Sequence, residues 1–290
     1  MLLCAYEDTW ELLENLATIG NIFGYSFTSV SVNVLLSIYI FERRCDMKKL
    51  NKLLFFIALA VGLSSQSFAN PVLLTYDFQV GAGNQAAVAN ATSKFSKSKK
   101  FSELQGAMYL NSYDFGGTGS HSFAVFHKSP TAANDFVSTL NQNPDFIAFA
   151  SSLNNAGSYL GAAYYNVVKT WNPPDGTGKQ FQTLPAAITN VSGAIKAMDT
   201  WTSTAEFKSL NASLMLLEQR AGGAPGATHA FVVLYDNRGA YEEAWTVASA
   251  SKNWRAAVSS FSRHGRVLGS LMGSPLAEFG DTSKTAEMLK

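Results

Sequence analysis

The feature that most constrains the fold of this chain is an internal repeat. Residues 120–125, Ser-His-Ser-Phe-Ala-Val, return 108 residues later as Thr-His-Ala-Phe-Val-Val at 228–233. The match continues downstream without a gap. Upstream, Phe101 aligns with Phe207, so the second copy carries two extra residues in the intervening loop. A repeat of this length sets the folding unit at roughly 100 residues, an ordinary domain size.

Residues 47–69 have the three parts of a secretory signal peptide in the expected order. Basic residues at 48–52 precede an uncharged apolar core at 53–63, and Ser67 and Ala69 are small where a signal peptidase needs small residues. The apolar core is too short to cross a bilayer, which needs roughly 20 residues. We therefore expect cleavage after Ala69 and an exported protein, periplasmic or extracellular, without a stable membrane anchor.

Residues 1–46 precede this signal and allow two interpretations. The stretch 15–41 is uncharged and long enough to span a membrane, with Arg43 just after it. Polar and glycine residues dilute that stretch. We favour the other interpretation, in which translation starts at Met47 and residues 1–46 are a spurious extension.

Composition excludes several classes of site from the exported chain. Both cysteines, Cys4 and Cys45, precede the signal, which rules out disulfides, thiolate metal sites and cysteine nucleophiles after residue 69. That part of the chain has 17 Lys and Arg against 15 Asp and Glu, a formal charge of +2. Such a balance gives no basic field for nucleic acid.

Each copy predicts the element order β-α-β-β-α-β. Ser129 followed by Pro130 is typical of a helix start. Pro185 predicts that the first strand of the second copy is a sheet edge. The expected divisions are a first repeat at 70–171, a linker at 172–180, a second repeat at 181–279 closed by a strand at 266–271, and an irregular tail at 280–290.

This order makes a four-stranded antiparallel sheet with both helices on one face. The strands are apolar on their other face too, and that face must be buried. Two fused copies can cover each other. We therefore expect an α+β protein in which two ferredoxin-like repeats pack sheet to sheet as a pseudo-twofold barrel, monomeric because one chain supplies both halves.

The repeat order, the paired helical segments at 130–153 and 239–261, and the doubling resemble the dimeric α+β barrel superfamily in tandem-fused form. The resemblance covers about residues 72–271 and carries no diagnostic motif. Members of the superfamily include antibiotic-biosynthesis-type monooxygenases, small lyases, and haem enzymes of the chlorite dismutase type. The resemblance therefore implies a fold and leaves the activity open.

His121 and His229 are the catalytic candidates, because they occupy equivalent positions at the start of the third strand of each copy. An imidazole at a barrel mouth can act as a general base. The competing interpretation is structural, with each histidine fixing the neighbouring turn. No metal site is expected, because zinc needs three or four ligands and the spacing supplies no such set.

Alternation along the third strand puts further candidates on the face of these histidines, and the first strand adds two polar residues without equivalents in the second copy. A cluster of aromatic residues around the last strand could stack on a ring-shaped ligand, although core packing is the favoured explanation: Tyr159, Tyr164, Tyr165 and Trp171. The ligand-binding candidates are Tyr76, Asp77, Phe123, His127, Phe231 and Tyr235.

Two functions are consistent with these observations. The favoured one is an exported barrel that binds a small apolar or aromatic ligand, with monooxygenase- or lyase-like chemistry and no cofactor, haem being a lesser alternative. The other is a non-enzymatic envelope protein that has a structural role or binds a partner. An interior site would favour the first, and a packed interior would favour the second.

Overall fold

The computed structural model describes residues 70–104, 106–117, 119–174 and 180–290. The predicted signal peptide and the residues before it lie outside this part of the chain. Among the described residues, no helix is long and apolar enough to cross a membrane.

The first repeat has the predicted element order. The helix after its third strand begins where the sequence indicates, because the Ser129 hydroxyl accepts from the backbone N–H of Ala132. The Asn143 side chain likewise accepts from the backbone N–H of Phe146 at the start of the next helix. The elements of the first repeat are β1 (Val72–Val80), α4 (Gln85–Phe95), η1 (Phe101–Glu103), β2 (Ala107–Phe115), β3 (His121–His127), α5 (Pro130–Leu140), α6 (Pro144–Ala156) and β4 (Gly157–Trp171).

The second repeat follows the same order, and Asn190 and Asn237 cap two of its helices. Its elements are β5 (Gln180–Ile188), α7 (Val191–Thr202), α8 (Ala205–Ser209), β6 (Ser213–Gly222), β7 (His229–Tyr235), α9 (Arg238–Ala250), α10 (Lys252–Phe261), β8 (Gly265–Val267) and β9 (Leu271–Gly280).

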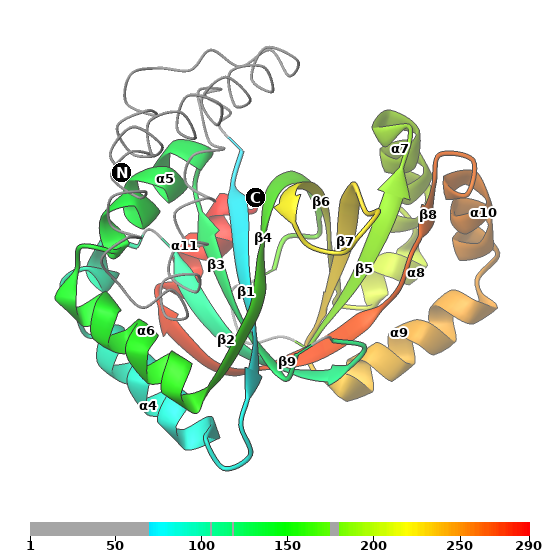
Figure 1. Ribbon diagram of the computed structural model, residues 1–290. Coiled ribbons are helices and arrows are strands. Elements are labelled where there is room, and N and C mark those ends of the chain that lie inside the picture. The colour runs from blue at the N-terminus through cyan, green and yellow to red at the C-terminus, as the bar shows by residue number, and fades with distance from the viewer. Residues whose placement is uncertain (1–69, 105, 118, 175–179) are drawn as a thin grey trace, which may run out of the picture. The chain divides into compact units, whose positions relative to one another are not determined.

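Eight antiparallel strands close into a barrel in the order β7-β6-β4-β1-β3-β2-β9-β5, with β5 pairing back to β7. The repeats join at their edges: β4 pairs with β6, and β2 pairs with β9. Each junction unites the fourth strand of one repeat with the second strand of the other, so the two junctions are equivalent. Helices α4 to α6 cover the outside of the first repeat and α7 to α10 that of the second (Figure 1).

The prediction that Pro185 makes β5 an edge strand is wrong, because β5 pairs with β7 on one side and with β8 and β9 on the other. Proline has no N–H to offer a neighbouring strand. The ladder accommodates this at the gap between β8 and β9, where the N–H of Leu268 donates to the Pro185 carbonyl over 2.7 Å. The closing strand is thus two segments that extend well beyond residue 271.

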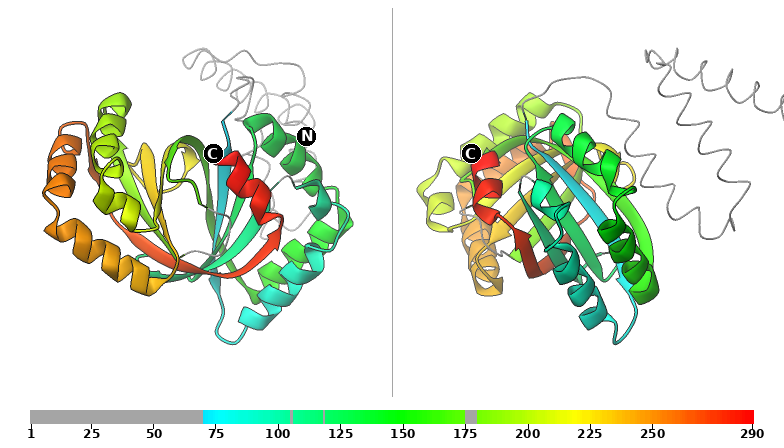
Figure 2. Two further views of the ribbon diagram at one scale, coloured as in Figure 1. Left: turned by 180° about the vertical axis from the view of Figure 1, so that it is seen from behind. Right: turned by 90° about the vertical axis from the view of Figure 1, so that its left-hand side faces the viewer.

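The expected irregular tail is instead a short helix, α11 (Thr282–Met288), capped by Asp281. The Thr285 hydroxyl accepts from the backbone N–H of Ala107 over 2.9 Å. Leu289 is buried in the same cluster as Leu73 inside the barrel. The C-terminal segment therefore packs against one end of the barrel, next to β2 and β3 (Figure 2).

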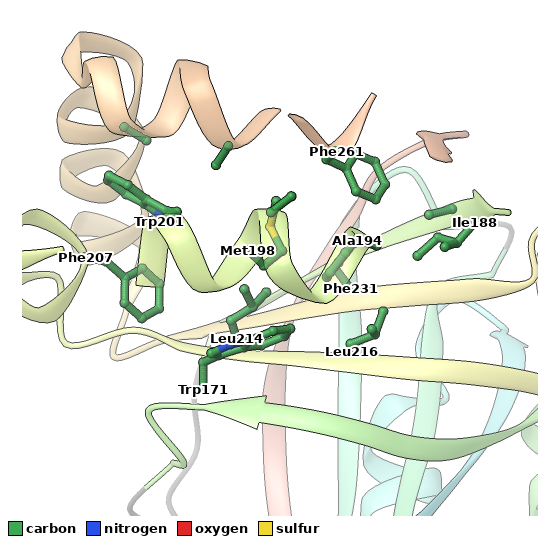
Figure 3. Packing of buried hydrophobic residues seen from close by; sticks show 14 residues of the cluster. Trp171, Ile188, Ala194, Met198, Trp201, Phe207, Leu214, Leu216, Phe231 and Phe261 are labelled. Carbon is green, nitrogen blue, oxygen red and sulfur yellow. The ribbon is translucent and has the colours of Figure 1, made fainter. Parts of the chain in front are cut away.

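The second repeat buries a core between its sheet and its helices, with α7 lying over the strands (Figure 3). Trp171, from the end of β4 in the first repeat, belongs to this core. Its indole N–H donates to Asp199 of α7 over 2.6 Å, and Lys169 pairs with the same carboxylate oxygen. A side chain from one repeat thus helps to fill the core of the other.

Candidate ligand site

The interior of the barrel has its own hydrophobic cluster, built from strands of both repeats. Because side chains alternate along a strand, this cluster identifies which positions face inward. The inward-facing set includes Leu73 of β1, Phe126 of β3, Tyr165 and Val167 of β4, Met215 and Leu217 of β6, and Ala230 and Val232 of β7.

His121 and His229 do not face the interior. They share a strand face with Phe123 and Phe231, and those two rings contact Phe149 of α6 and Phe261 of α10. The predicted alternation along β3 and β7 is correct, so these residues do share one face of the sheet. That face, however, is covered by helices and does not line the barrel interior. An interior ligand therefore cannot reach either imidazole directly.

Each of these histidines has a structural partner instead. The hydroxyls of Ser120 and Thr228 lie 2.8 Å from the Nδ1 atoms of His121 and His229. The same hydroxyls accept from the last backbone N–H of β1 and of β5, over 2.9 Å in both repeats. Burial lowers the pKa of both imidazoles. The geometry agrees with the interpretation that they fix the hairpin, because the same set of bonds is present in both copies.

The remaining candidates on this face are also packed under helices. His127 is 1% exposed, lies against the ring of Phe136, and has no hydrogen-bond partner for Nε2 among the described residues. Burial lowers its pKa to about 4. Tyr235 contacts Tyr241 of α9. Tyr76 lies directly opposite Phe123 in the β1–β3 ladder, and so shares its outward face.

Asp77 is the one predicted site residue that faces the interior. It is four residues along β1 from Leu73 and has the same orientation. The phenol of Tyr113, on β2, donates to Asp77 Oδ1 over 2.5 Å. Opposite Asp77 on β3 lies Ser122, whose hydroxyl accepts from the Asn111 amide over 3.4 Å. The interior of the first repeat therefore has a polar centre.

The electrostatics of this centre depend on Asp77. Burial raises the pKa of its carboxyl, and the hydrogen bond from Tyr113 opposes that rise. Burial and then the nearby Asp77 charge raise the pKa of Tyr165 to about 12. The same two causes raise the pKa values of Tyr113 and Tyr159. At neutral pH these phenols stay protonated and can donate hydrogen bonds.

Open space lies beside Asp77. Gly161 of β4 is paired with Asp77 and faces the same way, and a Cβ placed on it would meet no atom within 4 Å. Other glycines of the barrel are tightly enclosed: a Cβ on Gly222 would lie 1.9 Å from the Ala162 carbonyl oxygen. Asp77, Tyr113 and Tyr165 are each only half-buried. The barrel is therefore not filled at this point.

The second repeat has no such centre. The strand registers place Pro185 where the first repeat has Asp77, and Ala230 where it has Ser122. Gln219 replaces Tyr113. The polar group therefore belongs to one half of a nearly symmetric barrel.

Sequence reasoning found Asp77 through its lack of an equivalent, and noticed Tyr165 without assigning it. It missed Asn111, Tyr113, Ser122 and Gly161. The same alternation on the second strand puts Asn111 and Tyr113 on one face, an unusual pair of polar groups in an apolar strand. The sequence thus contains the signal for this polar pair. It does not show which face of the sheet lines the barrel interior.

Solved structures share this architecture. A candidate monooxygenase from Fusobacterium nucleatum subsp. nucleatum aligns with a TM-score of 0.51 at 12% identity, over 74% of this chain and 96% of that chain. The fold is the ferredoxin-like α+β barrel. An anthrone oxidase-like protein aligns with a TM-score of 0.45 at 12% identity, over 73% of this barrel chain and 93% of its own.

A mutant chlorite dismutase from Candidatus Nitrospira defluvii aligns with the barrel with a TM-score of 0.45 at 12% identity, over 77% of this chain and 95% of that one. No protein-family model and no curated protein matches the sequence. At such identities the likeness concerns the fold alone.

The expectation that the protein uses no cofactor is wrong as an inference from this fold, because barrels of this architecture include chlorite dismutase, which is haem-dependent. Among the described residues, however, no histidine lies on the interior face, where it could be an axial ligand of a haem iron. His121, His127 and His229 lie on helix-covered faces, and the ring of His264 packs against Gly193 of α7. The described residues also contain no group of three or more His, Cys, Asp or Glu side chains that could hold a metal ion.

Proposed function

We propose that this protein is an exported barrel that binds a small molecule inside its first repeat, with Asp77 as the polar group that the ligand contacts. One observation carries the proposal: among the described residues, the Asp77 carboxyl lies beside the unfilled space at Gly161, whereas the equivalent position of the second repeat holds Pro185. A group needed only for folding would be expected at the equivalent position of both repeats. The hydrogen bonds at His121 and His229 follow that rule, because both repeats have them. A single ligand needs only one such group.

The centre is suited to proton transfer. A carboxyl whose pKa is raised by burial is a better general base than an ordinary one, because its proton affinity lies closer to neutrality. The protonated phenols around it can donate to an oxygen on which negative charge develops. Oxygenase- and lyase-type reactions commonly begin by removing a proton from the substrate. We assign that role in such a reaction to Asp77, with Tyr165 as the donor.

The closed end of the barrel supports entry from the side of Asp77. Leu289, which follows α11, is buried beside Leu73, whereas Asp77 and Tyr113 keep exposed area. Export is part of the proposal and is supported by the signal-type pattern at 47–69. The proposal also includes a monomeric state, because both junctions between the repeats form within one chain.

The test is native mass spectrometry of the chain from residue 70 to 290, purified from its own host. We expect a monomer with extra mass that unfolding releases. Asp77→Asn should abolish that extra mass. The double variant His121→Gln, His229→Gln is the matched control, because it changes titratable groups of the same barrel that face the helices. If the double variant lost the mass and Asp77→Asn kept it, the site would be in the wrong place.

A further inference from the structure

The Asp77 carboxyl is a half-buried acid without a basic partner among the described residues. Among the described residues it forms no ion pair, and its hydrogen bond comes from the neutral phenol of Tyr113. Glu218, another half-buried carboxylate of the barrel, is by contrast paired with Arg220. Keeping an ionised carboxylate out of water without a counterion is costly. The apo site therefore has an unmet demand for positive charge.

Aromatic residues lie near the same carboxyl. Tyr113 and Tyr165 are close enough to Asp77 for its charge to raise their pKa values. Phe181 of β5 brings a third ring, whose centroid lies 6.3 Å from that of Tyr113. The faces of aromatic rings attract cations, and cages of such rings with a carboxylate are a recurring way to recognise alkylated ammonium groups.

Beside the carboxyl, a Cβ built on Gly161 would meet no atom within 4 Å, so the interior face is open at this point. The space at Gly161 adjoins Asp77 on the interior face, and the backbone of Gly161 is in a conformation that any residue can adopt. Gly269 is its counterpart in the second repeat and also has no atom within 4 Å of a built Cβ. Only the space at Gly161 has an acid next to it, because Pro185 replaces Asp77 in the second repeat.

We propose that the space between Asp77, Gly161 and the rings of Tyr113 and Tyr165 accepts a small organic cation, an alkylated ammonium group, with Asp77 as its counterion. The inference rests on the proposed function and adds the charge and class of the ligand. Gly161 is then the residue that sets the size of the group admitted.

Isothermal titration calorimetry on the chain from residue 70 to 290 at pH 8 tests the charge. The probes are choline, its uncharged carbon isostere 3,3-dimethylbutan-1-ol, and the anion 3,3-dimethylbutanoate. We expect choline to bind at least tenfold more tightly than the alcohol, and the anion not to bind. Asp77→Asn should remove the preference for choline. Equal affinities for choline and the alcohol, or an unchanged preference in Asp77→Asn, would overturn the inference.

Variants at Gly161 and Gly269 test the position of the proposed binding site. Gly161→Val should weaken choline binding at least tenfold, whereas the matched variant Gly269→Val should bind as the parent does. Gly161→Ala, with a smaller side chain, is the second variant if Gly161→Val fails to fold in a thermal melt. Choline binding unaffected by Gly161→Ala or Gly161→Val would refute the site.

The inference and the proposed function fail separately. If Asp77→Asn removes the co-purified mass but none of the three probes binds, the interior site stands and its ligand is not an organic cation. If neither the mass nor choline binding depends on Asp77, both are wrong.

Discussion

Asp77 and Pro185 occupy the same register position of the two repeats, and of these two residues Asp77 alone carries a charge. Proline at the equivalent position leaves the second repeat without a carboxyl and coincides with the break between β8 and β9. The two repeats thus differ at this strand position in both strand pairing and side-chain charge. The hydrogen bonds of Ser120 and Thr228 at the hairpins are the same in both repeats.

Asp77→Asn is expected to stabilise the protein at neutral pH. Because burial raises the pKa of this carboxyl, the folded state binds its proton more tightly than the unfolded state does. The ionised group therefore lowers the free energy of unfolding above the folded-state pKa, and this penalty disappears as the pH falls through it. Thermal melts from pH 4 to 8 should show the melting temperature of Asp77→Asn exceeding that of the parent at the upper end only. A lower melting temperature at pH 8 would contradict the burial of a charge.

His127 should produce the opposite pH dependence. Its folded-state pKa is about 4, well below the ordinary value, so the stability it permits is complete above roughly pH 6.5 and is lost as the pH falls toward 4. The whole effect amounts to about 3 kcal/mol at most. We expect His127→Phe to flatten the acid limb of a plot of unfolding free energy against pH. An unchanged limb would mean that the imidazole is protonated easily in the folded state.

Trp171 should matter more than its position at the end of a strand suggests. Trp171→Ala removes a buried ring from the core of the other repeat, which costs about 3–5 kcal/mol in typical proteins. Lys169→Ala is the control, since it removes a partly exposed partner of the same Asp199 and should cost less than about 1 kcal/mol. Urea denaturation monitors both. Equal losses would mean that the ion pair, rather than the ring, joins the repeats.

The two hairpin hydroxyls should have equal and independent effects. Ser120→Ala and Thr228→Val each leave a backbone N–H at the end of β1 or β5 without its acceptor, at a cost of about 1 kcal/mol. Because the two sites lie in different repeats, the double variant should lose the sum. Chemical denaturation provides the values. A change in ligand binding by either variant would argue against a purely structural role for the neighbouring histidines.

The exported form should begin at Asn70. Amino-terminal sequencing of protein recovered from outside the cytoplasm is the measurement, since cleavage after Ala69 follows from the signal-type pattern. A mature protein that retains residues before 47 would show instead that the upstream segment is made and kept.

Much of the fold could be predicted because the periodicity and the repeat are properties of the sequence itself. The order of elements in each repeat is as expected, and α5 begins at the serine–proline start that the sequence indicates. The path of β9 was predicted too short. Its partner β2 lies far away in sequence, and the strand carries Pro275 and little local β signal.

The site was harder to predict for a different reason. Alternation shows which residues share a face but does not show whether helices or the barrel interior cover that face. His121, Phe123 and His127 were grouped correctly and placed on the wrong side. Asp77 was found because it breaks the repeat, and Tyr113 was missed because its bond to Asp77 depends on the pairing of β1 and β2 with β3 between them.

The ladder between β2 and β9 also governs when this protein can finish folding. It joins residues 107–115 to residues 272–280, so during synthesis the second strand waits for nearly the whole chain before its partner exists. Until then β2 remains an unprotected strand edge, of the kind that pairs with neighbouring chains. Ribosome-bound intermediates of this protein should accordingly depend on chaperones until the last strand emerges, however stable the finished barrel is.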